Sequence, residues 1–362
     1  MKLTIEKTAL SGALKLVKPL AKGASTLPIL SCVLLSVADG TLTLTTTDLD
    51  TGLELRLPCA ASEDGSLAVS ASRLSALVDQ MCGEDIALET VRGALVLKSG
   101  SDEAKLMTLA AAEFPAMSKP MKLGEKMEFS CGELAAAIRK VLPFISQEEA
   151  RYVLNGVYFE NTKEADVVLV ATDGRRLAKV ILEDRGEQVA PFIAPACALR
   201  RLAALDVAEP VTLRTNESQL VADGGTWRLV AKLIEGNYPN FAQVIPTIGA
   251  KAWRLTLEPK STAAAVAFLR GVQPKPDAAV TLAEVGGVLE LQAKGPEIGE
   301  ALRRLDAKVP TGMLAAFNGQ FFAQAAEMFG GSPVEMAMND AASGALFTAE
   351  GALVVLMPLR VS

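Results

Sequence analysis

Two short segments carry an acidic side chain that could do chemistry, and the second also carries two arginines. Asp48 lies in Thr46-Thr47-Asp48-Leu49, and Asp173 is followed within three residues by Arg175 and Arg176. A carboxylate beside two arginines could bind a phosphorylated ligand, because guanidinium groups donate paired hydrogen bonds to phosphate oxygens. The chain contains no histidine, so the commonest general base is missing. An enzyme acting on a phosphorylated ligand is therefore a hypothesis with little further support.

Other patterns of catalysis are missing from the sequence. It contains neither G-x-x-x-x-G-K-[ST] nor G-x-S-x-G, and the segment 295–299 lacks the strand-to-helix glycine spacing of a nucleotide site. The five cysteines show no paired C-x-x-C spacing, which argues against a zinc site or a disulfide framework. We expect no catalytic residue, no metal and no cofactor. The cysteines, which we expect to be small core residues, are Cys32, Cys59, Cys82, Cys131 and Cys197.

The segment from Ala171 to Leu177 also has a purely structural interpretation. Asp-Gly dipeptides favour turns, because the aspartate side chain can accept hydrogen bonds from its own backbone. A turn that follows a strand would account for Asp173 and Gly174 without any ligand. From these residues alone, the turn and a binding role are equally supported.

The elements around these segments form a repeat. Thr47-Asp48 and Thr172-Asp173 are 125 residues apart, and Phe114-Pro115 and Tyr238-Pro239 are 124 apart. A weaker third copy runs from near Trp253 to the strand ending at Leu356. Apolar periodicity predicts six helices, at about 9–22, 72–82, 131–142, 197–206, 261–272 and 319–329, with alternating strands between them. We predict an α+β protein whose antiparallel sheets are covered by helices on one side, with domains at 1–120, 121–246 and 247–362.

The composition indicates a globular protein with large cores. The chain has 362 residues and is 50% hydrophobic. No run of about 18 apolar residues could cross a bilayer, and the start of the chain carries Glu6 and several lysines where a signal peptide would be apolar. We therefore expect a cytoplasmic protein without a membrane partner.

The charges are distributed unevenly. A net charge of −6 and a pI near 5.1 are unusual for a protein that binds nucleic acid. The predicted helices nevertheless contain nine basic and four acidic residues, so the excess of acid lies elsewhere. Helices that face phosphates and an outer surface that repels DNA would have this distribution, although surface helices also carry lysine and arginine for solubility. The charged helix residues are Lys15, Lys18, Lys22, Arg73, Arg139, Lys140, Arg200, Arg201 and Arg270, with Asp79, Glu133, Asp206 and Glu327.

Five motifs follow one another in an order that resembles a known family. They are Thr26-Leu27-Pro28-Ile29-Leu30, Thr46-Thr47-Asp48-Leu49, Arg151-Tyr152-Val153-Leu154-Asn155-Gly156, Ala171-Thr172-Asp173-Gly174-Arg175-Arg176-Leu177 and Met357-Pro358-Leu359-Arg360. In order, spacing and total length the chain resembles the bacterial DNA polymerase III beta sliding clamp. The resemblance spans the whole chain.

The resemblance implies a processivity factor that has no catalysis of its own. It implies a head-to-tail homodimer whose six domains close a ring, with helices lining a central hole and sheets on the outside. The ring would encircle duplex DNA without sequence specificity. Its protein partners would be the polymerase catalytic subunit, the clamp loader and other proteins that carry short clamp-binding peptides.

Residues that match the family's functional positions fall into three groups. The group expected to contact DNA is Lys15, Lys18, Lys22, Arg73, Arg139, Lys140, Arg151, Tyr152, Arg200 and Arg201. The group expected to line a peptide-binding cleft is Leu154, Thr172, Gly174, Arg175, Arg176, Leu177, Pro239, Val244, Asn318, Phe321, Ser343, Val355, Met357, Pro358 and Leu359. The group expected at the dimer interface is Ala104 and Leu106 with Phe268 and Leu269.

The chain departs from the family pattern at several positions. Arg175 replaces the usual histidine, Ala24 replaces an arginine, and Glu148 replaces a glutamine. Ala196-Cys197 stands where a basic pair is common. Because several of these positions are expected to contact DNA, a second hypothesis stays open: a clamp-like scaffold that binds partner peptides but is poorly loaded on DNA.

Overall fold

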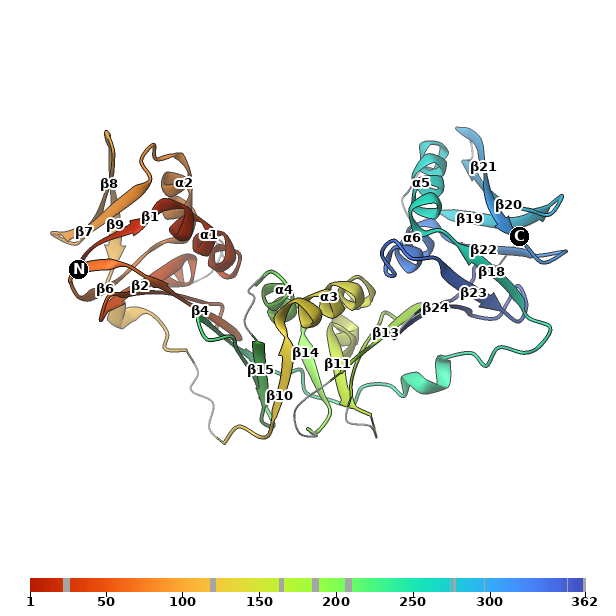
Figure 1. The fold of residues 1–362 in the computed structure, drawn as a ribbon, viewed down its shortest axis with the longest axis horizontal. Coiled ribbons are helices and arrows are strands. Elements are labelled where there is room, and N and C mark those ends of the chain that lie inside the picture. Colours follow the sequence, from red (N-terminus) through yellow and green to blue (C-terminus); the bar gives the residue numbers. More distant parts are fainter. Residues whose placement is uncertain are drawn as a thin grey trace. The chain divides into compact units, whose positions relative to one another are not determined.

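The computed structural model describes residues 1–21, 27–117, 122–162, 166–183, 189–205, 210–273, 275, 278–295, 297–349 and 351–360. The chain divides into two compact units, whose helices and strands are labelled in Figure 1. Unit 1 comprises Met1–Ala135, Asp184–Val189 and Cys197–Leu233, and unit 2 comprises Ala136–Glu183, Ala190–Ala196 and Ile234–Ser362.

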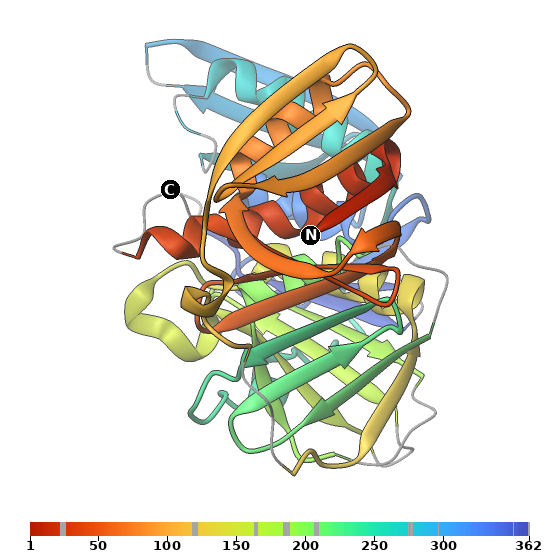
Figure 2. The same ribbon diagram turned by 90° about the vertical axis from the view of Figure 1, so that its left-hand side faces the viewer.

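Unit 1 is built on one antiparallel sheet of 13 strands in the order β10-β15-β16-β17-β4-β3-β2-β6-β9-β8-β7-β1-β5. Figure 2 shows α1 and α2 lying against its N-terminal strands. The strands are β1 (Lys2–Glu6), β2 (Cys32–Ala38), β3 (Thr41–Thr47), β4 (Thr51–Pro58), β5 (Ala60–Glu63), β6 (Gly65–Ser70), β7 (Asp85–Val91), β8 (Ala94–Ser99), β9 (Asp102–Leu109), β10 (Lys126–Ser130), β15 (Pro210–Thr215), β16 (Gln219–Asp223) and β17 (Trp227–Lys232). The helices are α1 (Lys7–Val17), α2 (Ala71–Gln80) and, in part, α3 (Cys131–Val141) and α4 (Ala196–Leu202), with short turns η1 (Lys18–Leu20), η2 (Pro28–Ser31) and η3 (Ala111–Glu113).

Unit 2 contains an eight-stranded and a four-stranded antiparallel sheet, in the orders β14-β11-β12-β13-β25-β24-β23-β18 and β21-β20-β19-β22. The strands are β11 (Gly156–Asn161), β12 (Val167–Thr172), β13 (Arg176–Leu182), β14 (Phe192–Pro195), β18 (Trp253–Leu257), β19 (Ala279–Val285), β20 (Val288–Gly295), β21 (Gly299–Lys308), β22 (Leu314–Asn318), β23 (Val334–Met338), β24 (Ala345–Ala349) and β25 (Ala352–Leu356). Its remaining helices are α5 (Pro259–Leu269) and α6 (Gly319–Glu327), with η4 (Leu142–Phe144), η5 (Glu149–Leu154), η6 (Phe241–Val244) and η7 (Arg270–Val272).

The strands β2 and β3 form a hairpin around Asp39-Gly40. Leu42 and Leu44 are fully buried, as period-two alternation requires of a strand with one face in the core. Asp39 and Gly40 both have positive φ, 48° and 71°. Two such residues match the backbone twist of antiparallel strands, so this short turn fixes the register of the pair.

The helix boundaries differ from the predicted ones by a few residues. The first helix, expected at about 9–22, begins at Lys7 and ends at Val17, and it buries Leu10, Leu14 and Val17 on one face. A 3-10 turn follows because Pro19 has no N–H to continue the helix. The other five helices shift in the same small way, and Arg270 lies in η7 outside α5.

Strands from different repeats share sheets within each unit. In unit 1, β4 pairs with β17, and in unit 2, β13 pairs with β25. The compact units therefore do not follow the three predicted domains, because the last strands of the second and third repeats, β17 and β25, pair with strands of the repeat before them. The domain boundaries at 120 and 246 rest on the repeat and remain our proposal.

We expected all five cysteines to be small core residues, and for two of them this prediction is wrong. Cys32 and Cys131 are buried and Cys59 is half-buried, whereas Cys82 and Cys197 are exposed. Cys82 follows the end of α2, and Cys197 lies in the first turn of α4. Within the part of the chain that the structure describes, all five are free thiols, no three metal-ligating side chains cluster, and no helix is long and apolar enough to span a membrane.

Candidate functional site

The Thr-Asp-Gly segment forms a closed turn between β12 and β13. The Thr172 hydroxyl donates to the Arg176 carbonyl at 2.7 Å and accepts from the Gly174 N–H at 3.1 Å. One Asp173 carboxylate oxygen accepts from the N–H groups of Arg175 and Arg176, at 2.9 and 3.1 Å. The structural role predicted for Asp173 is confirmed, since its side chain holds its own backbone in the turn.

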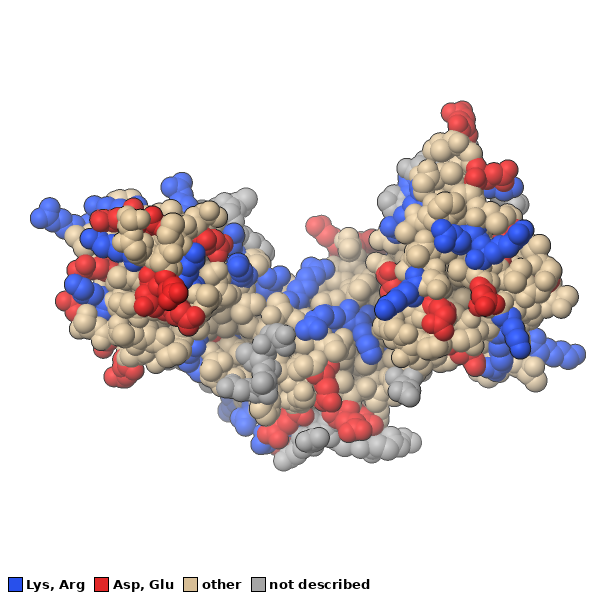
Figure 3. Space-filling model, turned by 45° about the horizontal axis from the view of Figure 1, so that its top comes forward, with Lys and Arg blue, Asp and Glu red and all other residues tan. Residues whose placement is uncertain are grey.

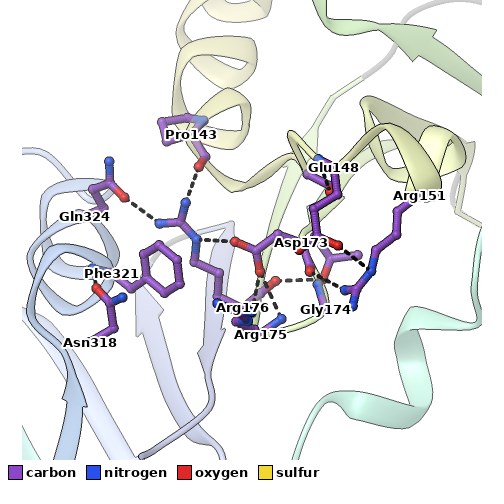
Figure 4. A network of polar contacts seen from close by, with 12 residues as sticks. Pro143, Glu148, Arg151, Asp173, Gly174, Arg175, Arg176, Asn318, Phe321 and Gln324 are labelled. Carbon is purple, nitrogen blue, oxygen red and sulfur yellow. Dashed lines mark hydrogen bonds and ion pairs between the residues drawn. The ribbon is translucent and has the colours of Figure 1, made fainter. Parts of the chain in front are cut away.

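Arg151 supports this turn from η5. Its Nη1 donates to the Asp173 carbonyl at 3.0 Å, while its Nε lies 3.1 Å from the Glu148 carboxylate (Figure 4). Gly174 has a φ of +85°, and a Cβ at this position would lie 2.7 Å from Arg151 Nη1. Glycine is therefore needed both for the backbone conformation and for the close approach of the guanidinium.

Arg176 is buried inside unit 2, and its guanidinium joins three elements (Figure 4). The residue is 7% exposed. Nε donates to Asp173 Oδ2 at 2.9 Å, Nη1 to Gln324 Oε1 on α6 at 2.5 Å, and Nη2 to the Pro143 carbonyl in η4 at 2.5 Å. The guanidinium carbon lies 3.9 Å from the centre of the Phe321 ring. Burial lowers the pKa of Arg176, and the Asp173 carboxylate partly opposes this shift.

An apolar surface adjoins this turn. Leu177 and Val355, each 2% exposed, are directly opposite each other on β13 and β25, and they pack with Val168 and Val170. The Met357 N–H donates to the Arg175 carbonyl at 3.0 Å, which carries the chain beyond β25 past the turn. The residues that extend this floor to the surface are exposed: Val244 (56%), Met357 (47%) and Leu359 (40%). Exposed apolar side chains in segments that adjoin a buried apolar cluster are typical of a protein-binding surface.

The other expected cleft residues have different surroundings. Leu154 is 8% exposed, and Thr172, Phe321, Ser343 and Pro358 are half-buried. The Asn318 side chain caps α6 by accepting from the Phe321 N–H at 3.0 Å. Gly174, Arg175 and Pro239 are exposed. The structure thus brings the turn, β25 and α6 together in unit 2, with Arg176 as internal support.

The residues expected to contact DNA lie mostly on exposed helix faces. In unit 1, Lys18, Arg73 and Arg200 are exposed, while Lys15 lies 3.9 Å from the Asp79 carboxylate across α1 and α2. Burial, followed by the neighbouring Arg200, lowers the pKa of the half-buried Arg201. In unit 2, Arg139, Arg151 and Tyr152 are exposed and Lys140 is half-buried. Lys22, like Ala24, lies outside the described residues.

The basic character of the helices survives the corrected boundaries. Within the observed bounds, the six α-helices contain eight basic and three acidic residues. Figure 3, which draws Lys and Arg in blue, shows basic side chains interspersed with acidic ones on the face in view. An acidic chain can therefore still present positive charge to phosphates.

The expected interface residues lie at or near open sheet edges. Ala104 and Leu106 are half-buried on β9, and residues 102–107 of that strand pair only with β8 among the described strands. In unit 2, Phe268 is 50% exposed with Arg303 stacked 4.7 Å from its ring centre. Leu269 is a correction: it is fully buried in the core under α5, so its side chain cannot contact a second chain.

Known proteins with this sequence pattern and fold decide the family. Residues 1–118 and 128–240 match the N-terminal and central domains of the DNA polymerase III beta subunit. The chain is 30% identical over 375 residues to the beta sliding clamp of Caulobacter vibrioides, covering 100% of both. This chain belongs to the beta sliding clamp family. The family's processivity factors are not enzymes, which agrees with the expectation from the sequence.

Solved clamp structures share the fold over the full length. The sliding clamp of Bartonella birtlesii bound to griselimycin has 26% identity and a TM-score of 0.90, with 100% of both chains covered. The Caulobacter crescentus pol III beta structure has 30% identity and a TM-score of 0.87, again over 100% of both chains. The predicted α+β clamp fold is confirmed.

Sequence reasoning missed the residues that hold the site together. Pro143, Phe144 and Gln324 surround Arg176, and none belongs to a recognisable motif. The support that Arg151 gives to the turn was also missed. One signal was available: Gly174, because a glycine after Asp173 indicates either a positive φ or a close neighbour, and here it serves both.

Proposed function

We propose that this chain works as a DNA sliding clamp, which encircles duplex DNA and keeps a replicative polymerase on its template. The observation that carries the proposal is similarity over the entire length, in sequence and in fold, to proteins named beta sliding clamp. The cytoplasm, where a bacterial polymerase copies DNA, is the compartment that this function requires. The rival scaffold hypothesis, based on Ala24, Ala196 and Glu148, is less well supported.

DNA contact in this proposal is weak and independent of sequence. The exposed basic residues of α1, α2, α3 and α4 would meet phosphates. Each neutralised phosphate contributes a salt dependence with a slope of about −0.9, so a protein that must slide should make few tight contacts. Glu148 fits this pattern, because its ion pair with Arg151 leaves that arginine less free to hold a phosphate.

Retention therefore has to come from a closed ring, and the sheet edges suggest how it closes. We propose that the open edge of β9 pairs with an open edge strand of a second chain. β21 is suitable, because it pairs only with β20 among the described strands and lies beside Phe268 through Arg303. Exposed apolar side chains occur on both edges, Met107 (78%) on β9 and Leu302 (42%) on β21. Pairing would satisfy the free backbone groups of both strands.

Retention on DNA tests the function directly. The purified protein, loaded by a cognate clamp loader onto nicked circular DNA, should elute with the DNA and be released when the circle is cut once. Retention on both forms would indicate ordinary DNA binding. Retention on neither form, with peptide binding intact, would support the scaffold instead.

Partner proteins in this proposal bind the apolar surface of unit 2 defined by Leu177, Val244, Val355, Met357 and Leu359. An extended peptide could place alternate side chains on this floor while its backbone bonds to the chain beyond β25. The polymerase, the clamp loader and other factors would compete for the same surface. Arg175, exposed at its edge, is available to an acidic group on the peptide.

Charge placed on this surface should abolish partner binding. For Leu177→Glu we expect loss of a polymerase peptide whose wild-type affinity would be near micromolar, roughly −8 kcal/mol. Because Leu177 is buried, Met357→Glu provides a second variant at an exposed position, where folding is not at risk. Ile181→Glu, on the same strand and 40% exposed, is the matched control. Unchanged peptide binding in folded Met357→Glu would contradict the assignment.

A further inference from the structure

The first copy of the repeat builds the same turn as the second, bond for bond. The Thr47 hydroxyl donates to the Thr51 carbonyl at 3.0 Å and accepts from the Leu49 N–H at 3.0 Å. One Asp48 carboxylate oxygen accepts from the N–H groups of Asp50 and Thr51, at 3.2 and 2.8 Å. Leu49 has a φ of +79°, close to the +85° of Gly174 at the matching position. The equivalence therefore extends to backbone conformation.

The strand beside the turn is also repeated in register. Val230 of β17 is directly opposite Gly52 of β4, as Val355 is opposite Leu177. The Lys232 N–H donates to the Asp50 carbonyl at 2.8 Å, which matches the bond from Met357 to Arg175. The offset of 125 residues thus holds for both partners of the strand pair.

A cavity of about 110 Å³ lies beside the first-copy turn. Its lining includes the counterparts of seven residues expected to line the cleft of the second copy: Thr47, Leu49, Asp50, Gly52, Pro115, Val230 and Lys232. All of them belong to unit 1. The same construction that supports the proposed peptide surface of unit 2 therefore encloses a pocket in unit 1.

Two differences determine what this pocket can hold. Gly52 replaces the leucine of the floor, and the Met117 side chain fills part of the space, with Cγ, Sδ and Cε 3.0 to 3.3 Å from where a Gly52 Cβ would be. At the mouth, Lys232 Nζ lies 2.7 Å from the Asp50 carboxylate. A cavity of 150 Å³ can hold benzene, so the smaller pocket has room for one aliphatic side chain.

Leu49 is placed as a contact residue for such a side chain. It is 52% exposed, and a leucine with positive φ is strained by roughly 1–2 kcal/mol relative to an ordinary conformation. An apolar side chain held at the surface in a strained conformation stabilises nothing in the fold. Strain of this kind is frequent at binding sites.

We propose that the pocket of the first copy is a second peptide-binding site, which takes a single aliphatic side chain of an extended partner peptide. The inference rests on the proposed function, since it extends peptide binding from the second copy of the turn to the first. The Met117 side chain moves aside as the peptide enters, because an unbranched methionine side chain is flexible. The narrower pocket and the ion pair at its mouth make binding weaker than at the second copy.

The test uses the full chain with its methionine methyl groups labelled for NMR and the Met117 signal assigned with Met117→Leu. The probe is the capped peptide Ac-Leu-Ser-Leu-Ser-Leu-NH2, whose alternate leucines all face one side when it is extended. In Leu177→Glu or Met357→Glu, which block the second copy, we expect the Met117 methyl signal to shift with a dissociation constant of about 1 mM. Leu49→Asp should abolish the shift, and aspartate tolerates a positive φ, so this exposed position should fold normally.

A variant in which the first-copy pocket is already filled should give the opposite result. Gly52→Leu restores the residue type of the second copy, and the three atoms nearest its Cβ all belong to Met117. It should therefore remove the response of Met117 while peptide binding to the second copy stays unchanged. If the wild-type chain binds the probe but Met117 does not respond in the blocked variants, the second site is refuted and the proposed function stands. If the probe binds nowhere, peptide recognition by both copies is refuted.

Discussion

The turns at residues 47–52 and 172–177 share their backbone hydrogen bonds, but they differ in what their side chains support. In the second copy, Arg176 enters the interior of unit 2 and joins α6 and η4. In the first copy the matching residue is Thr51, which is 1% exposed and has its hydroxyl 3.3 Å from Cys197 Sγ. The comparison shows that the repeat determines a backbone frame, while single substitutions decide which copy is rigid and which contains a pocket.

The largest difference between the copies should appear on removing Arg176. Arg176→Met would leave Asp173 without its charged partner and the Gln324 and Pro143 oxygens without donors, so we expect about 3–5 kcal/mol of destabilisation. Thr51→Val, which removes only a hydroxyl, should cost no more than about 1.5 kcal/mol. Urea unfolding of both variants measures the contrast. Equal losses would show that the guanidinium is not the internal support that its contacts indicate.

A smaller effect should follow from adding a side chain at Gly174. We expect Gly174→Ala to cost about 1–2 kcal/mol for the positive φ, and more because the new methyl meets Arg151 Nη1. In an Arg151→Ala background only the backbone part of the cost should remain. The same unfolding measurement, run as a double-mutant cycle, separates the two contributions, and the absence of any coupling would contradict the contact with Arg151.

The smallest predicted effect has the opposite sign. Leu49→Gly removes the strain at the matching position of the first copy, but it also gives the unfolded chain more freedom, which offsets about 0.4–1 kcal/mol of the gain. We expect a net stabilisation of about 0.5 kcal/mol. A careful comparison of unfolding midpoints can detect it. Destabilisation would mean that Leu49 packs in the fold and is not held at the surface as a contact residue for a peptide.

The sequence predicts those features of the two turns that depend on residues close together in the chain. The 125-residue offset located both turns, and Asp173 and Gly174 correctly indicated a turn, because their chemistry acts within a few residues. The burial of Arg176 could not be predicted, since its partners are 148 and 33 residues away in Gln324 and Pro143. The positive φ of Leu49 was equally hidden, because the chain imposes on leucine a conformation that leucine disfavours.

The helices and sheets also divide into features that local sequence patterns predict and features that depend on residues far apart in the chain. Apolar periodicity found all six helices, yet Pro19 and the 3-10 turns moved their ends. Leu269 resembled an interface residue by family position, but its place on the inner face of α5 puts it in the core. The sharing of sheets between repeats could not be foreseen, because pairing of β4 with β17 and of β13 with β25 joins segments far apart in the sequence.

If the ring is retained on DNA by its topology, the lifetime of the loaded protein on one DNA circle should depend on whether the circle is closed or has been cut once. Measured at 50 and 200 mM salt, the lifetime on the closed circle should change less than about tenfold and should collapse at both salts once the circle is cut. Retention through six to ten phosphate contacts would instead weaken by about 10³ to 10⁵ over this range, on either form of the DNA. A lifetime that follows salt and ignores the cut would contradict the account.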